Sequence, residues 1–259
     1  MRFIPLFSGS SGNSSYIEAG GTRLLVDAGL AGRMITDALD EVDVRAETLS
    51  GILVTHDHID HTKGVGVLSR KYDLPVYATA GTFRAMAPIV RELAFPNVRL
   101  IRPGEDFYIG GINVIPFATP HDAAEPCGFC FVEGGKKLCY MTDIGCFRES
   151  MFDAAAGSDL MFIESNHDIE MLKHGPYPYP LKQRILSEHG HLSNAKCGEA
   201  LVRLYETGVR FAVLAHLSRE NNTEELAFST VLSALEEAGI DDMQLVVAKR
   251  DRTTAIFEI

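Results

Sequence analysis

The apolar stretches of this sequence are short, and they fall into two successive blocks that each mix strand-like and helix-like patterns. Glycine pairs at 20–21, 110–111 and 134–135 separate several of the apolar runs, as expected for strands joined by tight turns. Between these runs, apolar residues recur at helical spacing. Two blocks of this kind predict an α/β fold in which two sheets pack face to face with helices outside, as one domain over residues 1–259.

The same patterns place the individual elements. We expect strands at 2–7, 15–19, 22–26, 52–55, 76–78, 98–101, 106–109, 112–117, 128–133, 137–141, 160–164, 211–215, 245–248 and 254–258. We expect helices at 31–42, 64–72, 82–89, 194–207 and 223–238. The stretch 175–180 is rich in Pro and Tyr and cannot continue a regular element, so we expect a surface loop or lid there.

Composition limits the class of protein. Hydrophobic residues make up 46% of the 259 residues and charged residues 23%, which is ordinary globular usage and excludes a disordered, collagenous or coiled-coil chain. The formal net charge of −11 would repel a nucleic-acid backbone or an anionic membrane unless positive charge is added locally. Bound metal ions would add that charge.

Two further features concern the location of the protein. No stretch approaches the roughly 18 apolar residues of a membrane span, and the first residues lead into Ser and Gly and not into an apolar signal core. We therefore expect a cytoplasmic protein with no membrane partner. Five scattered cysteines do not describe a disulfide framework, and the CxxC spacing at 127–130 lies in an apolar run that predicts a packed strand.

The strongest functional signal is the segment 55–61, which reads THDHIDH and directly follows an apolar strand. Alternation places His56 and His58 on one side of an extended segment, whereas Asp60 and His61 lie where the chain can turn toward a second centre. The spacing favours two metal ions over one. Imidazole and carboxylate donors without a thiolate fit Zn²⁺, Mn²⁺ or Fe²⁺. The alternative interpretation is a polar surface turn.

Two metal ions require more ligands, and three candidates lie at the ends of expected strands: His121, Asp143 and His216. Strand ends are rigid positions from which a side chain can bind a metal. A carboxylate can place one oxygen on each of two ions, which holds them about 3.5–4 Å apart.

These residues together resemble the metallo-β-lactamase superfamily, in which HxHxDH after a strand is followed by a separate His, a separate Asp and a last His. The resemblance spans most of the chain and implies an αββα four-layer sandwich with two divalent metal ions, Zn²⁺ or Mn²⁺. The implied ligands are His56, His58 and His121 for one ion, Asp60, His61 and His216 for the other, and Asp143 between them. Asp27, in the segment LVDAG, would support the ligand loop.

Two features bear on the branch of this superfamily. The β-lactamases themselves usually have a Cys ligand and a signal peptide, whereas this chain has Asp143 and no expected export segment. Glu164, together with the segment GHLS at 190–193, resembles the phosphodiesterase branch that includes transfer-RNA 3′-processing nucleases. There a Glu and His pair handles protons, so His191 would contact the scissile phosphate or protonate the leaving oxygen, with Glu164 orienting it. Asp60, Glu164 and His191 are thus the expected catalytic residues.

Five segments resemble the bacterial WalJ (YycJ) family, small cytoplasmic metallo-β-lactamase-fold proteins regarded as DNA exonucleases of 5′-to-3′ direction. The segments are 8–15, 164–168, 177–185, 190–194 and 216–222. The inserted nucleic-acid-binding domain of larger nucleases cannot fit, because too few residues separate Asp143 from His216.

The expected reaction is phosphodiester hydrolysis, in which two ions lower the pKa of a bridging water so that hydroxide forms near neutral pH. We expect substrate contacts from Ser11 and Asn13 in the Ser/Gly-rich loop, and from His191 and Ser193. Lys182 and Arg184 would add positive charge, or form a solvated helix start. The net charge of −11 predicts a small footprint on single-stranded DNA ends, or reliance on a protein partner in DNA repair.

Two other functions remain open. A hydrolase of small molecules, such as a thioesterase, a lactonase or a cyclic phosphodiesterase, would use the same metals. A metal-binding regulator without activity is the third alternative, and the intact ligand set argues against it. The sequence leaves the choice of Zn²⁺ or Mn²⁺, of DNA or RNA, and the oligomeric state open.

Overall fold

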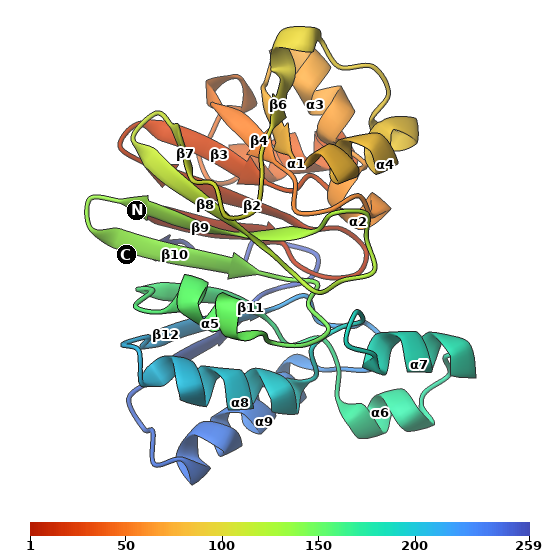
Figure 1. Ribbon diagram of the computed structural model, residues 1–259, viewed down its shortest axis with the longest axis vertical. Coiled ribbons are helices and arrows are strands. Elements are labelled where there is room, and N and C mark those ends of the chain that lie inside the picture. The colour runs from red at the N-terminus through yellow and green to blue at the C-terminus, as the bar shows by residue number, and fades with distance from the viewer. The chain divides into compact units, whose positions relative to one another are not determined.

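A computed structural model describes residues 1–259 and divides the chain into two units (Figure 1). Unit 1 comprises Met1–Ala118, Ala123–Gly135 and Lys249–Ile259, and unit 2 comprises Thr119–Asp122 and Lys136–Ala248. None of the helices has both the length and the apolar character needed to cross a membrane.

Unit 1 contains a mixed sheet of seven strands in the order β14-β1-β2-β3-β4-β5-β6. The strands are β1 (Arg2–Phe7), β2 (Ser14–Ala19), β3 (Thr22–Val26), β4 (Gly51–Leu53), β5 (Val76–Ala78), β6 (Val98–Leu100) and β14 (Phe257–Glu258). Strands β1 to β3 are antiparallel, and β3 to β6 are parallel. The Met1 ammonium group donates to the Ile259 carbonyl over 2.8 Å, so the two termini meet at this sheet.

The parallel part of this sheet is covered by helices. They are α1 (Gly32–Asp40), α3 (Val65–Tyr72) and α4 (Ala80–Val90), which lie beside one another in Figure 1. Ile35 and Leu68 of these helices pack with Leu25 and Ile52 of the strands in one buried apolar cluster. Because a strand buried on both faces carries little alternation, its apolar run in the sequence is continuous, as at 51–54.

Unit 1 also contains three antiparallel strands, β7 (Phe107–Ile109), β8 (Ile112–Ala118) and β9 (Cys127–Glu133). Gly110 turns the chain between β7 and β8 with a φ of +54°, a conformation that glycine adopts without strain. Cys127 and Cys130 lie buried in β9, which is the packed strand expected from their apolar run.

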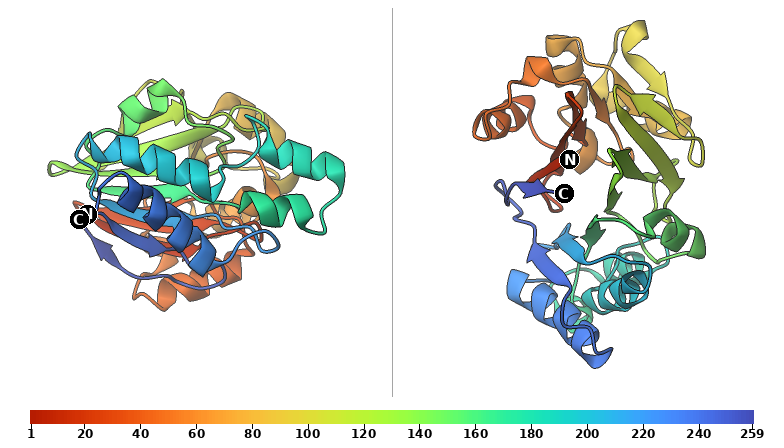
Figure 2. Two further views of the ribbon diagram at one scale, coloured as in Figure 1. Left: turned by 90° about the horizontal axis from the view of Figure 1, so that it is seen from below. Right: turned by 90° about the vertical axis from the view of Figure 1, so that its left-hand side faces the viewer.

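Unit 2 is built on four parallel strands, β10 (Lys136–Met141), β11 (Leu160–Glu164), β12 (Phe211–Ala215) and β13 (Gln244–Val247). Its helices are α5 (Glu149–Ala155), α6 (Ile169–His174), α7 (Tyr179–Leu186), α8 (Asn194–Tyr205) and α9 (Glu224–Glu237). Helices α8 and α9 lie side by side (Figure 2). Their approach is close at Gly198, where an added Cβ would lie 2.7 Å from the Ala234 Cβ.

The structure corrects three expectations. The stretch 175–180 is not only a loop, because α7 begins at Tyr179 with Pro180 in its first turn, where the missing N–H costs nothing. The expected strand at 254–258 is confined to Phe257–Glu258. The short helices α2 (Ile59–Thr62), α5, α6 and α7 were not among the expected elements.

The strand ends that carry expected site residues share an unusual backbone conformation. Asp27 follows β3 with a φ of 61°, Asp143 follows β10 with 57°, and His216 follows β12 with 55°. L-residues rarely adopt this left-handed region, and when they do at a functional site the surrounding structure holds them there. The sharp turn ends each strand and redirects the side chain.

Candidate metal centre

In unit 1, one loop and one helical turn bring three imidazoles together. The chain leaves β4, passes through His56 and His58, and enters α2, which carries Asp60 and His61. The His56 ring lies 4.6 Å from the His58 ring and 4.1 Å from the His61 ring, measured between centroids. His56 and His61 are buried, whereas His58 and Asp60 are half-buried. The expectation that Asp60 and His61 sit where the chain turns is met by the short helix α2.

Asp27 fixes this loop from beneath. One oxygen of its carboxylate accepts the backbone N–H of Thr55 over 2.8 Å, and the other accepts the Thr55 hydroxyl over 2.8 Å. That second oxygen also lies 2.7 Å from His61 Nδ1. With Nδ1–H donated to Asp27, the lone pair of His61 is at Nε2, which lies 3.7 Å from an Asp60 oxygen.

Thr55 is a functional residue that the sequence reasoning missed. Its hydroxyl lies 3.0 Å from His56 Nδ1, so it orients a second imidazole in the same way as Asp27 orients His61. The available signal was a hydroxyl residue between an apolar strand and the first His.

Asn13 ties the Ser/Gly-rich loop to the same place. Its side-chain oxygen accepts the Gly9 N–H over 2.9 Å, its amide nitrogen lies 3.0 Å from His61 Nε2, and its backbone N–H donates to the Asp60 carbonyl over 2.8 Å. Asn13 is buried, whereas Ser11 is exposed. The structure therefore brings Asn13, but not Ser11, into contact with the ligand loop.

In unit 2, the carboxylate of Glu164 at the end of β11 accepts four hydrogen bonds. One oxygen lies 2.8 Å from Nδ1 of both His191 and His216. The other oxygen accepts the backbone N–H groups of Ile144 over 2.9 Å and Leu192 over 3.1 Å. The side chain is fully buried, so these contacts orient two imidazoles and two chain segments at once.

The charge state of Glu164 follows from these contacts. Burial raises the pKa of this carboxyl, but the charge and hydrogen bond of His191 and the hydrogen bond of His216 outweigh burial and lower the pKa to about 2. Glu164 is therefore ionised near neutral pH and acts as an acceptor. It has no oxygen lone pair left for a metal, so its role is to orient the two histidines.

Asp143 and His121 complete the group in unit 2. Asp143 Oδ1 lies 3.4 Å from His216 Nδ1, 3.7 Å from His191 Nδ1 and 3.8 Å from His121 Nε2. His121 Nδ1 lies 3.0 Å from the Gly190 carbonyl, to which it donates, and its lone pair is then at Nε2. One nitrogen or oxygen atom from each of Asp143, His191, His216 and the Glu164 that orients them lies within 4.8 Å of the others.

These donor sets fit a divalent metal ion. In both units the imidazoles are held through Nδ1 by a carboxylate, a hydroxyl or a carbonyl, which is how proteins orient His ligands of Zn²⁺ and similar metals. Asp143 adds a buried carboxylate. Imidazole and carboxylate donors suit Zn²⁺ and Mn²⁺ alike.

A buried polar network joins three of the segments that resemble the WalJ family. The Asn222 side chain donates to the carbonyls of Ser165 and Asn166, over 2.9 and 3.0 Å, and pairs with Asn194 over 2.9 Å. Asn166 in turn donates to the His216 carbonyl over 2.8 Å. The network holds the segments at 164–168, 190–194 and 216–222 against one another, at the ends of β11 and β12 and at the start of α8.

The remaining candidate residues, Ser193, Arg184, Lys182 and His167, all lie in unit 2. The Ser193 hydroxyl oxygen accepts the Lys196 N–H over 3.3 Å and so caps helix α8. Arg184 forms an ion pair with Asp122, and Lys182 donates to the Lys173 carbonyl over 2.8 Å. His167 is buried, and burial is the main cause that lowers its pKa to about 4, so its ring is neutral.

The chain belongs to the beta-lactamase superfamily, a class of metal-dependent hydrolases, because the model of the beta-lactamase superfamily domain matches residues 22–217. It is 41% identical to exodeoxyribonuclease YycJ of Bacillus anthracis over an alignment of 239 residues, and this alignment covers 92% of this chain and 90% of that one. It is 39% identical to exodeoxyribonuclease WalJ of Streptococcus pneumoniae serotype 2 over an alignment of 263 residues, and this alignment covers 100% of this chain and 98% of that one.

The fold is also shared with solved structures. The Zn²⁺-bound PqqB from Methylobacterium extorquens matches with a TM-score of 0.76 and 18% identity, over 100% of both chains. The family and the metallo-β-lactamase fold predicted from the sequence are thus confirmed.

The support that Asp27 gives to the ligand loop can be tested directly. We expect Asp27→Asn to weaken metal binding about 10- to 100-fold, because an amide cannot accept from Thr55 and His61 as the carboxylate does. Asp43→Asn is a matched control, since Asp43 has nearly the same φ, 60°, but is exposed. Metal content after dialysis against defined free-metal buffers measures the effect. Equal metal affinity in the two variants would contradict the prediction.

Proposed function

We propose that this protein is a metal-dependent phosphodiesterase that degrades DNA from strand ends in the 5′-to-3′ direction. The observation that carries the proposal is the contact of one Glu164 oxygen with both His191 and His216. It fixes a half-buried imidazole beside an expected metal ligand, and phosphodiester cleavage requires a proton donor at such a position for the leaving oxygen. The relatives named exodeoxyribonuclease support DNA as the substrate.

The proposed centre holds two divalent ions, Zn²⁺ or Mn²⁺. Such ions, when bound, lower the pKa of a water and neutralise negative charge on the phosphoryl oxygens. The proposed ligands are His56, His58 and His121 for one ion, Asp60, His61 and His216 for the other, and Asp143 shared. Support comes from the Nδ1 contacts of His56, His61, His121 and His216, each of which directs the lone pair to Nε2.

Each remaining residue has a proposed role. His191 donates its Nδ1–H to Glu164, so Nε2 is the atom that would give a proton to the leaving oxygen. Ser193, at the N-terminus of α8, would donate its hydroxyl to a phosphate oxygen, and the exposed Ser11 would do so from its loop. Asn13 would act through its contacts with Asp60 and His61.

The wider setting follows from the charge. A net charge of −11 favours a small footprint on single-stranded DNA ends and leaves a role for a protein partner in DNA repair. We also propose that residues 1–259 act together as one hydrolase domain, and that the protein works in the cytoplasm.

The test is cleavage of 5′-labelled and 3′-labelled single- and double-stranded DNA and RNA by the metal-loaded protein. Asp60→Ala is run in parallel, with Asp40→Ala as a control because Asp40 is exposed at the end of α1. We expect progressive loss of nucleotides from DNA, released from the 5′ end, which disappears only with Asp60→Ala.

Two outcomes would contradict the proposal. Cleavage that persists undiminished in Asp60→Ala would remove the metal centre from the reaction. Hydrolysis of a simple thioester or cyclic phosphate without cleavage of any polymer would assign the protein to small-molecule chemistry.

A further inference from the structure

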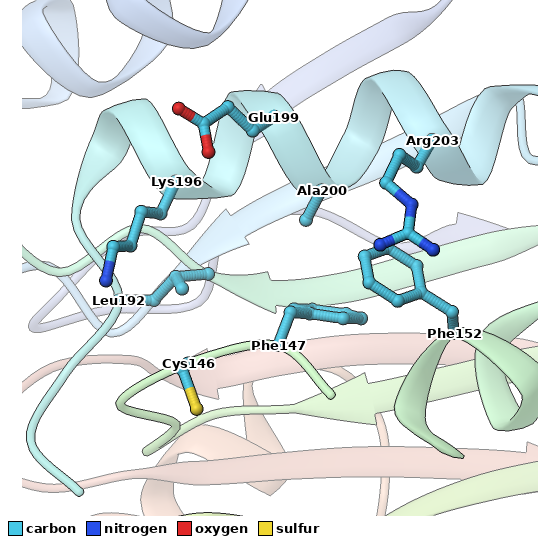
Figure 3. Close-up of a pocket in the computed structure, with 8 residues that line it drawn as sticks. All are labelled: Cys146, Phe147, Phe152, Leu192, Lys196, Glu199, Ala200 and Arg203. Carbon is cyan, nitrogen blue, oxygen red and sulfur yellow. The ribbon is translucent and has the colours of Figure 1, made fainter. Parts of the chain in front are cut away.

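A cavity of about 270 Å³ lies within unit 2, between helix α8 and the segment that follows Asp143 (Figure 3). Its lining includes Phe147, Phe152, Leu192 and four residues of α8, which are Lys196, Glu199, Ala200 and Arg203. Pockets for drug-sized ligands measure about 300–1,000 Å³, so this one suits a single small planar group.

The cavity lies next to the candidate catalytic residues Glu164 and His191 in the structure. The two backbone N–H groups that Glu164 accepts belong to Ile144 and Leu192. Leu192 itself lines the cavity and directly follows His191, whereas Ile144 lies between Asp143 and the lining residue Phe147. The Glu164 carboxylate therefore contacts the His191 ring, the lining residue Leu192 and the segment that leads to the lining residue Phe147.

Helix α8 brings both signs of charge to the cavity, with Lys196 and Arg203 on one side of the helix and Glu199 beside them in sequence. Lys196, Ala200 and Arg203 are spaced by four and three residues, so they share a side of the helix, and Figure 3 shows all three directed toward the cavity. Ala200 is small and leaves the room between the two cations. The opposite side of α8 is closed by α9, against which Gly198 packs.

The two phenylalanine rings that line the cavity, Phe152 and Phe147, have different neighbours. The Arg203 guanidinium lies 3.7 Å from the centre of the Phe152 ring and is held there by Glu149, over 2.9 and 3.1 Å. Phe147 is half-buried, and its ring centroid lies 4.5 Å from that of Phe152 at an angle of 45°. Phe147 is thus the ring that offers a face to a molecule in the cavity.

We propose that this cavity holds one base of a single DNA strand, stacked on Phe147, while Lys196 contacts a phosphate of the same strand and the neighbouring phosphodiester lies at His191. The inference rests on the proposed nuclease function. An aromatic face beside cations is the arrangement by which proteins bind single strands without reading their sequence. Arg203 is paired with Glu149 and Glu199 also lines the cavity, so Lys196 is the cation that we assign to the phosphate.

The test uses single-stranded oligonucleotides in which one abasic nucleotide is moved stepwise past the cleavage point. For the wild type we expect kcat/KM to fall about 5- to 150-fold when the missing base is the one in the cavity, because stacking of a base on an aromatic side chain is worth that factor. In Phe147→Ala this penalty should shrink to about twofold or less, since intact and abasic strands then bind alike. Phe147→Leu keeps apolar bulk without a ring and should behave similarly.

Three controls separate this role from a structural one. Phe228→Ala removes an exposed ring from α9, away from the cavity, and should keep the abasic penalty. Bis(p-nitrophenyl) phosphate has no base, so its hydrolysis should be unchanged in Phe147→Ala. Lys196→Gln should reduce the salt dependence of oligonucleotide binding.

The outcomes distinguish failure of the base site from failure of the proposed nuclease function. If the wild type cleaves DNA but Phe147→Ala keeps the full abasic penalty, or loses oligonucleotide and bis(p-nitrophenyl) phosphate activity equally, the base site is overturned and the nuclease function stands. If the wild type cleaves no oligonucleotide, the proposed function fails, and the base site fails with it.

Discussion

Replacing His191 by alanine is expected to slow phosphodiester cleavage about 10²- to 10⁴-fold, the usual contribution of a positioned proton donor. His191 Nδ1 is held by Glu164 over 2.8 Å, and its side chain keeps 19% of its surface exposed, so the imidazole is both oriented and accessible. The loss should appear in kcat for oligonucleotides with little change in metal content, because His191 is not among the proposed ligands.

A matched control and a second substrate make this prediction specific. His189 is an exposed histidine two residues earlier, and His189→Ala should keep full activity. A leaving group that needs no proton, such as p-nitrophenolate, should be released by His191→Ala at a rate close to that of the wild type. Equal losses for a poor and a good leaving group would show that His191 does not supply the proton.

Glu164→Gln is expected to lower the free energy of unfolding by about 2–5 kcal/mol. The amide NH₂ group of glutamine is a donor, so it cannot accept the hydrogen bonds that one carboxylate oxygen now accepts. The buried N–H groups on that side would then be left unpaired. The contacts at risk are those with Ile144, Leu192, His191 and His216. The proposed phosphodiesterase activity should fall at least as far as in His191→Ala, because the substitution also disturbs the proposed metal ligand His216.

Urea denaturation of the metal-loaded protein measures the stability change. Glu236→Gln, an exposed position on α9, is the control and should unfold at the same urea concentration as the wild type. A Glu164→Gln variant that unfolds like this control would mean that the four contacts contribute nothing to stability.

The sequence predicted best the features that depend on short, regular patterns. The apolar run at 51–54 followed by THDHIDH located both a strand and the histidine-rich loop after it, because a buried strand and the loop after it are contiguous in the chain. The same holds for the positions of Asp143 and His216, because Asp143 lies two residues after the end of β10 and His216 directly follows β12. The family resemblance added the proposed assignment of these residues to two ligand sets, each of which combines residues far apart in the sequence.

Other features were out of reach for a physical reason. Helices α2 and α6 have four and six residues, too few to show a helical period, and such short helices are stabilised by tertiary contacts and not by their own propensity. The Asn222 contacts join residues 28 to 57 positions apart, and a lone asparagine carries no sign of its partner. Thr55 was missed for the same reason, since its partner Asp27 is 28 positions away.

The left-handed turns at Asp27, Asp143 and His216 set stability against activity at three positions of the chain. A non-glycine residue in that conformation opposes folding by about 1–3 kcal/mol, with aspartate tolerating it better than histidine. Glycine or asparagine would relax the backbone at each place, but at Asp27 the buried contacts with Thr55 and His61 offset that cost. A homologue with Gly at position 143 or 216 would therefore have an unstrained turn there, but it would lack the carboxylate or imidazole that we propose binds a metal.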